Sequence, residues 1–284
     1  MAALVYIVLC IIWGSTWIAI KIGLTDAPPL WAASIRFMIA VTLIGAYVLV
    51  KRFPFPKSLG EFLRMGHPGV YMYGASYALV YFGETYINSA LAAVLFGSFP
   101  FFVALLSHFA LAEKKTSTLG WLGMLIGFAG VVLISYDSLQ TSQHLFLGTM
   151  LLLAGSFASA FGLMIHKRNY GQANIYVAAL VQMLCGGILL LVAALIFENF
   201  GDFTWSANSV GSIIYLAVLG TVVAFLGYYW LLTKARTVTV SLIAFVTPLV
   251  AILIGVFLFD EQLSALILIG AALILSGIAL VVKK

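Results

Sequence analysis

Charged side chains are scarce in this sequence. Its 284 residues include 14 Lys and Arg and 9 Asp and Glu, together 8%, whereas 64% are hydrophobic and the mean hydropathy is +1.16. A water-soluble fold cannot bury so much apolar surface with so few charges outside. The composition excludes a soluble protein and predicts an integral membrane protein.

Cysteines and catalytic motifs are also sparse. The two cysteines, Cys10 and Cys185, lie in apolar segments without a motif neighbour, so no disulfide framework or metal site is predicted. The absence of a Gly-x-x-x-x-Gly-Lys-Ser/Thr loop disfavours an ATP-driven pump. Ser98, Ser107 and His108 offer hydrolase residue types, yet no nucleophile motif or His-Glu-x-x-His surrounds them. We predict a protein that is not an enzyme and needs no cofactor.

Long uncharged runs fill the chain. Each matches the roughly 20 residues that a helix needs to cross a bilayer. The first run lacks a basic n-region and is too long for a signal peptide, so we expect it to be retained. The sequence predicts an all-α integral membrane protein with ten transmembrane helices at 2–23, 29–50, 67–87, 89–112, 117–136, 145–166, 173–197, 208–233, 237–259 and 263–282.

The basic residues gather in loops that follow even-numbered spans, and the acidic residues gather mainly on the other side. An excess of Lys and Arg marks the cytoplasmic side of a membrane protein, so both termini are predicted to be cytoplasmic. The basic group is Lys51, Arg52, Lys57, Arg64, Lys114, Lys115, Lys167, Arg168, Lys234, Arg236, Lys283 and Lys284, and the acidic group is Asp26, Glu84, Asp137, Glu198, Asp202, Asp260 and Glu261.

The chain repeats itself at an offset of 148 residues. Spans 1 to 5 align with spans 6 to 10, and because five is odd the second half must enter the membrane in the opposite sense. We predict a 5+5 inverted repeat with halves at 1–138 and 139–284, an architecture used by secondary transporters. The aligned pairs include Gly14 with Gly162, Tyr81 with Tyr229, Thr85 with Thr233, Pro100 with Pro248, Phe109 with Phe257, and Glu113 with Glu261.

Pro100 and Pro248 occupy the middle of predicted spans 4 and 9. Each removes one intrahelical hydrogen bond, so each is predicted to kink its helix, either as a hinge for alternating access or as a static bend. Small residues in spans 5 and 10 predict close helix packing, within one chain or between two copies of a homodimer. These small residues are Gly120, Gly123, Gly127, Gly130, Gly270, Ala271, Ser276 and Gly277.

Aromatic residues recur at helical spacing in the middle of the spans. Tyr73, Tyr77 and Tyr81 share one helix face. They either pack against another helix or form the wall of a cavity for a solute with an apolar body and a few polar groups. The candidate solute-binding residues are Trp13, Trp17, Tyr77, Tyr81, Ser98, Phe161 and Tyr229.

Two cations, Lys21 and Arg36, lie within predicted spans. Lys21 can extend to the interface, whereas Arg36 is roughly 10 Å into span 2 and must face protein or water. Asp26 and Glu84 are the expected partners of Arg36. Alternatively, both cations line an external vestibule that attracts a solute carboxylate. No carboxylate occupies the middle of a span, so coupling would use His108, a carboxylate near a span end, or solute exchange.

Several segments, taken together, resemble the ten-span EamA-type exporters of the drug/metabolite transporter superfamily. The resemblance rests on "WGSTWIAIKIGL", "PPLWAASIRF", "NSALAAVLFGSFPFFVALLSHFALAEK" and "GWLGMLIGFAGVVLI", with "TVTVSLIAFVTPLVAILIGVFLFDEQLS" and "LIGAALILSGIALVV" in the second half. "LAEK" and "FDEQ" depart from the family pattern, in which Gly usually precedes Glu. The resemblance implies two repeats around a central cavity, export of amino acids or related metabolites, and a prokaryotic inner-membrane location.

The leading hypothesis is a secondary transporter that exports small amphipathic metabolites, with amino acids as the favoured class, by alternating access. The residues Trp13, Trp17, Tyr77 and Tyr81 favour aromatic amino acids, so the aromatic amino acid exporters are the first comparison. The alternatives are a nucleotide-sugar or other metabolite exchanger, for which cations near the midplane are lacking, and a non-transporting membrane scaffold. The expected partners are a small solute and the lipid bilayer, with no nucleic acid.

Overall fold

The computed structural model describes residues 1–87, 89–110, 116–135, 145–259 and 265–282. All secondary structure in its described part is helical. The elements are α1 (Ala2–Gly23), α2 (Pro29–Lys51), α3 (Leu59–Gly69), η1 (Val70–Ala75), α4 (Ser76–Tyr86), α5 (Ser89–Phe96), α6 (Phe99–Ala110), α7 (Thr118–Ser135), α8 (Leu145–Tyr170), α9 (Ile175–Phe197), η3 (Phe200–Asp202), α10 (Ala207–Ala217), η4 (Val218–Val223), α11 (Ala224–Leu232), α12 (Thr237–Ser241), α13 (Ile243–Phe259) and α14 (Ala265–Val282).

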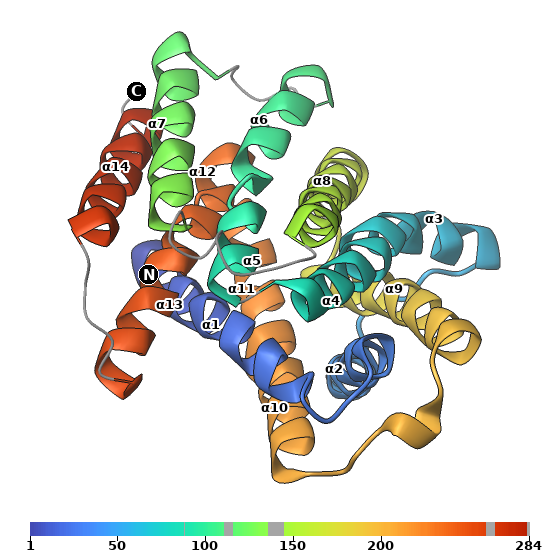
Figure 1. Cartoon of the computed structure of the whole chain (residues 1–284). Helices are drawn as coiled ribbons and strands as arrows, with labels where there is room; N and C mark the ends of the chain where they lie inside the picture. The colour runs from blue at the N-terminus through green and yellow to red at the C-terminus, as the bar shows by residue number, and fades with distance from the viewer. Residues whose placement is uncertain (88, 111–115, 136–144, 260–264, 283–284) are drawn as a thin grey trace.

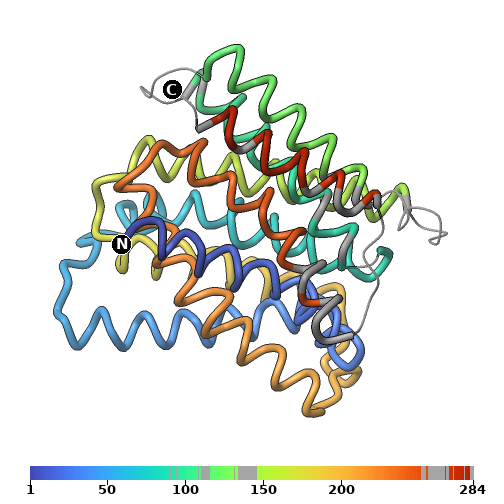
Figure 2. Tube along the Cα trace, turned by 90° about the vertical axis from the view of Figure 1, so that its left-hand side faces the viewer, coloured from blue at the N-terminus to red at the C-terminus, as the bar shows by residue number. Residues whose placement is uncertain are grey.

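The long helices run roughly side by side (Figures 1 and 2). Figure 2 places the N-terminus and the 52–58 connection at one end of the bundle, and the 24–28 turn at the other. Five helical stretches are long and apolar enough to cross a membrane: Ala2–Gly23, Pro29–Lys51, Phe146–Tyr170, Ile175–Phe197 and Ala207–Leu232. Shorter apolar helices accompany them, and the number of ten spans stays a prediction.

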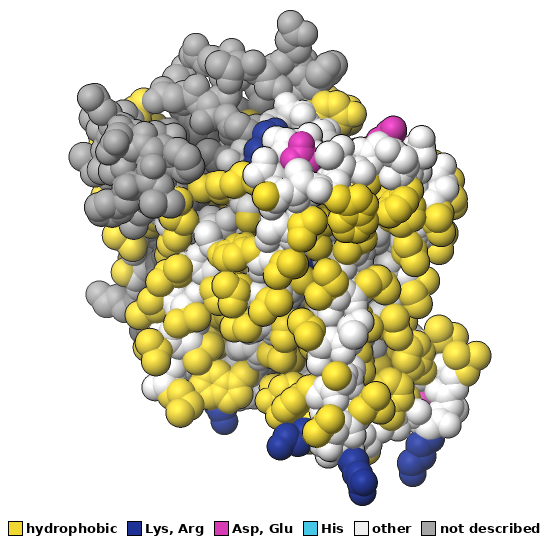
Figure 3. Space-filling view, turned by 90° about the horizontal axis from the view of Figure 1, so that it is seen from below, with side chains coloured by type: hydrophobic (Ala, Val, Ile, Leu, Met, Phe, Trp, Pro, Cys, Tyr) yellow, Lys and Arg dark blue, Asp and Glu magenta, His cyan; other side chains and the backbone are white. Residues whose placement is uncertain are grey.

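One face of the molecule is apolar between two charged edges. Figure 3 shows hydrophobic side chains covering the face seen from below, with Lys and Arg along its lower edge and the most prominent acidic side chains along the upper edge. On α1, the side chains of Leu4, Ile7 and Ile11 are more than half exposed at i, i+3 and i+7 spacing. A helix that exposes such a stripe is suited to contact with lipid.

Two π-helical stretches interrupt the α-helices, at η1 and η4, which lie 148 residues apart. This is the offset at which the sequence aligns with itself. In a π-helix the hydrogen bonds run to the fifth residue along, so the turn is wider than in an α-helix, and such turns often occur at functional positions. The sequence pattern did not predict either of them.

Pro100 and Pro248, at which kinks were predicted, have different surroundings. Pro100 is the second residue of α6, and two residues without helical geometry separate α6 from α5. The predicted kink in span 4 is therefore a break, with Pro100 in the first turn of the new helix, where its missing N–H costs little. Pro248 lies inside the continuous helix α13.

Helices α7 and α14 pack against each other at one flank of the bundle (Figure 1). A methyl group at Gly277 would lie 2.5 Å from the carbonyl oxygen of Gly123, and one at Gly123 would lie 2.7 Å from that of Gly277. Backbones this close require glycine. Gly123 and Gly277 therefore pack against each other within one chain, and the homodimer stays a prediction.

A carboxylate closes the N-terminal end of α2. Glu198, directly after α9, accepts hydrogen bonds from the backbone N–H of Leu30 at 2.9 and 3.1 Å and of Trp31 at 3.0 Å. An anion at this position satisfies free donors and interacts favourably with the helix dipole. Burial raises the pKa of Glu198, and the two N–H donors oppose that rise.

Candidate functional site

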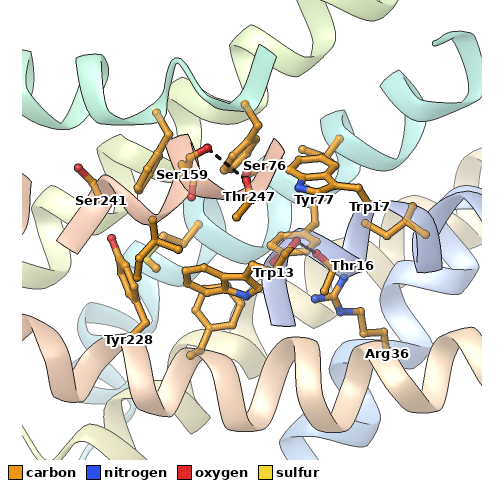
Figure 4. Close-up of a pocket in the computed structure, with 18 residues that line it drawn as sticks. Trp13, Thr16, Trp17, Arg36, Ser76, Tyr77, Ser159, Tyr228, Ser241 and Thr247 are labelled. Carbon is orange, nitrogen blue, oxygen red and sulfur yellow. Dashed lines mark hydrogen bonds between the residues drawn. The ribbon is translucent and has the colours of Figure 1, made fainter. Parts of the chain in front are cut away.

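A cavity opens between the helices near the centre of the bundle (Figure 4). The empty space between its walls is about 760 Å³, including its opening to solvent. Most of the wall is apolar or aromatic, with hydroxyl groups at intervals. The lining residues are Trp13, Thr16, Trp17, Ile20, Arg36, Met72, Ser76, Tyr77, Val80, Phe96, Phe99, Ser159, Phe225, Tyr228, Ser241, Ile243, Ala244 and Thr247.

Arg36 is the one charged residue among these lining side chains. It extends from α2 toward the cavity (Figure 4), yet only 1% of its surface is exposed. Its Nε donates to Thr221 Oγ1 at 2.8 Å, Nη1 donates to Tyr81 Oη at 3.3 Å, and Nη2 donates to the Gly220 carbonyl at 3.3 Å. None of these acceptors carries a negative charge, so Arg36 retains its positive charge without a counter-ion among its hydrogen-bond partners.

The π-helical stretch η4 supplies two of the three groups that accept hydrogen bonds from Arg36. The carbonyl of Gly220 accepts a bond from Arg36 and also one from Trp13 Nε1 at 3.2 Å. Thr221 donates its hydroxyl proton to the Leu216 carbonyl at 2.8 Å, so its oxygen is oriented to accept from Arg36. The widened turn therefore joins α1 and α2 to the second half of the chain.

Of the three tyrosines that share one helix face, Tyr77 lines the cavity, whereas Tyr73 and Tyr81 are buried in the core. Tyr77 lines the cavity, and its ring centre lies 4.8 Å from the guanidinium carbon of Arg36. This is within the range of a cation–π interaction. Tyr81 is buried and does not line the cavity, but it contacts two residues that do, Arg36 and Tyr77. Tyr73 donates to Tyr229, which donates to Gln182 at 2.5 Å. Tyr229 is therefore part of a buried series of hydrogen bonds and does not line the cavity.

The other predicted solute-binding residues also differ in whether they line the cavity. Trp13 and Trp17 line the cavity. Ser98 is buried and donates to Ser156 Oγ at 3.0 Å, outside the lining. Phe161 is 37% exposed and packs edge-on against Tyr71 on the outer surface, so the structure places it away from the cavity.

Two hydroxyls in the lining have no protein partner. Ser76 Oγ and Tyr228 Oη are both buried, and neither forms a hydrogen bond within the described part of the chain. Buried hydroxyls normally find partners. Both lie in the cavity wall, so they are free to bind polar groups of a solute or water molecules there. Neither residue was among the predicted solute-binding residues, although Ser76 is next to Tyr77 and its polar side chain in mid-span was an available signal.

Lys21 binds backbone carbonyls, and Arg36 does not have its predicted partners. Lys21 Nζ donates to the backbone carbonyls of Glu84 at 2.7 Å and Ile87 at 3.1 Å, which joins α1 to the end of α4. Asp26 accepts from Ser206 at 2.5 Å and not from Arg36. The expected Arg36 pair with Asp26 or Glu84 is therefore wrong. Neutral acceptors from η4 and Tyr81 take three of the five guanidinium N–H groups, one at each nitrogen.

No group of His, Cys, Asp and Glu side chains that could hold a metal was found in the described ranges. The side chain of His108 lies outside the part of the chain that is described.

The chain resembles known transporters over nearly its whole length. The model of the EamA-like transporter family matches residues 1–136 and 146–283. An uncharacterized inner membrane transporter of Escherichia coli K12, YedA, is 30% identical over 274 residues, which cover 96% of this chain and 88% of YedA. The uncharacterized transporter YoaV of Bacillus subtilis is 26% identical over 273 residues, covering 94% of this chain and 92% of YoaV.

The fold is also found among solved structures. One crystal structure superimposes with a TM-score of 0.80, covering 99% of this chain and 97% of the other, at 16% sequence identity. At that identity the likeness shows a shared fold alone.

Proposed function

This chain belongs to the EamA-like transporter family, and from that premise we propose that it exports small amphipathic metabolites that carry a carboxylate, most favourably aromatic amino acids. Its family is one of membrane transporters and not of enzymes. The observation that carries the proposal is the cavity itself, in which one uncompensated cation faces aromatic rings and two unpartnered hydroxyls.

The chemistry of the wall selects the solute. Arg36 can bind a carboxylate with charge-assisted hydrogen bonds, which are stronger than neutral ones. Trp13, Trp17 and Tyr77 offer flat apolar surfaces that suit an aromatic side chain. Ser76 and Tyr228 are available for the remaining polar groups, including an amino group. A nucleotide sugar carries two phosphates, for which the lining offers a single cation.

Transport by alternating access is the accompanying proposal. We propose that residues 1–138 and 139–284 form two halves of opposite orientation, with Pro100 and Pro248 as hinges. The family model matches each half separately, and η1 and η4 recur at the repeat offset, which supports a duplicated architecture. The N-terminus lies at the same end of the bundle as the basic 52–58 connection (Figure 2), which favours a cytoplasmic N-terminus. The likeness to the inner membrane transporter YedA favours a prokaryotic inner membrane.

Counterflow into proteoliposomes tests the proposal. Vesicles preloaded with unlabelled solute would receive labelled tryptophan, phenylalanine, threonine, alanine or a nucleotide sugar. We expect saturable accumulation of the aromatic amino acids, reduced in a Tyr77→Ala variant that remains monodisperse. Accumulation of the nucleotide sugar alone would favour the exchanger. Accumulation of none of the five, by protein that is folded and correctly inserted, would contradict the amino acid assignment and favour a scaffold.

A further inference from the structure

A second ionisable group lies near the cavity without lining it. Glu84 is in the last turn of α4, and its side chain is 0% exposed. Neither of its carboxyl oxygens has a hydrogen-bond partner in the described part of the chain. An ionised carboxylate buried in this way is costly unless it is paired, whereas the neutral acid loses far less on leaving water.

The two cations near Glu84 form hydrogen bonds with other acceptors. The charged groups that act on it are Lys21 from α1 and Arg36 from α2, while Tyr81 faces it from its own helix. Lys21 donates to backbone carbonyls, and Arg36 donates to Thr221, Tyr81 and Gly220.

The remaining helices around α4 add no charge. At the neighbouring Gly83, helix α8 contributes Gly148, Leu151 and Leu152, and α5 contains neither charged nor titratable residues. Within η1 the titratable groups are tyrosines, of which Tyr73 is bonded to Tyr229. The carboxyl group is therefore an unpaired acid between two cations.

We propose that Glu84 is a proton-binding site that couples solute movement to a proton gradient, an inference that rests on the proposed transport function. On release, the O–H bond of the carboxyl group breaks, its electron pair stays on the oxygen, and the proton passes to water on the side to which the site is open. On binding, the reverse occurs. The described structure, with both cations bound elsewhere, corresponds to the neutral acid.

Lys21 links the protonation state of Glu84 to the wall of the cavity. Its Nζ is already bonded to the backbone carbonyl of Glu84, at 2.7 Å, and its charge acts on the Glu84 carboxyl group, so Lys21 is the cation that would turn toward the carboxylate once that group is ionised. That rotation releases the bonds by which α1 is held to the end of α4. Trp17, one turn before Lys21, lines the cavity and packs in the same apolar cluster as Ile87 and Leu91. Loss of the proton would therefore loosen this wall of the cavity.

A pH gradient across proteoliposomes tests the coupling, with labelled tryptophan as the probe. For exchange of one proton per solute, the steady-state accumulation ratio changes about tenfold per unit of imposed pH difference. We expect Glu84→Gln to abolish this response, and Glu61→Gln, an exposed carboxylate that accepts from the Lys57 backbone, to retain it. Tryptophan flux that ignores the gradient in the unmodified protein, or a full response in Glu84→Gln, would overturn the proposal.

A second measurement keeps the proton site separate from the choice of solute. Infrared difference spectra of the purified protein between acidic and alkaline buffer detect carboxyl groups that lose a proton. We expect one buried carboxyl band that disappears in Glu84→Gln, shifts in Glu84→Asp and is unchanged in Glu61→Gln. If tryptophan is not transported but this band behaves as expected, the solute assignment fails and the proton site stands. A spectrum identical in the unmodified protein and Glu84→Gln would refute the site.

Discussion

Replacement of Arg36 by Gln should weaken the binding of solutes that carry a carboxylate and spare solutes that do not. The guanidinium is the one charged group in the described cavity wall. A hydrogen bond to a charged group contributes about 1.5–3 kcal/mol. Since about 1.4 kcal/mol corresponds to a tenfold change in affinity, the half-saturation concentration for tryptophan should rise about 10-fold to 100-fold.

The assay is counterflow with labelled tryptophan, repeated with labelled tryptamine, which has the same ring and amino group but no carboxylate. We expect Arg36→Gln to change the tryptophan value strongly and the tryptamine value little. Arg64→Gln is the matched control, because Arg64 is exposed and the one hydrogen bond of its side chain among the described residues is to the Gly60 carbonyl in its own helix. An unchanged half-saturation concentration for tryptophan in a folded Arg36→Gln protein would refute the role assigned to this cation.

Two stability predictions follow from backbone contacts. Gly277→Ala should lower the free energy of unfolding by about 1–3 kcal/mol, because the new methyl group would meet the Gly123 carbonyl at 2.5 Å; Gly211→Ala, with nothing within 4 Å, should leave it unchanged or raise it in the same thermal melt. Glu198→Ala should lower it by about 0.5–2 kcal/mol through loss of the α2 cap, whereas an unchanged melting temperature would show that water replaces the carboxylate.

The sequence predicts the class of fold because the length of an apolar run is a local property. The segment from Ala2 and the segment from Pro29 reach membrane-spanning length in the structure, as their composition indicates. Arg36 lies buried in protein, as the cost of a cation in lipid requires. Its partners were beyond prediction, because Thr221 is 185 residues away and η4 has no sequence signature.

The inward-facing side of a uniformly apolar helix was the feature hardest to predict from the sequence. In a soluble helix the polar face marks the outside, but lipid and protein interior are equally apolar, so periodicity does not say which face is inward. Trp17 and Phe161 both belong to aromatic pairs at i, i+4 spacing, yet Trp17 is 7% exposed in the cavity wall and Phe161 is 37% exposed on the surface. The distribution of charges along the chain placed Glu84 at the external side, and its burial became visible only in three dimensions.

The most direct test of the central claim compares Trp17→Ala with Phe161→Ala in tryptophan counterflow. The claim is that the described cavity binds the solute, and these substitutions remove one aromatic ring inside it and one outside it. The account predicts that Trp17→Ala raises the half-saturation concentration about tenfold, a loss of about 1.4 kcal/mol, while Phe161→Ala leaves it unchanged. Equal effects of the two substitutions, or an effect of Phe161→Ala alone, would contradict it.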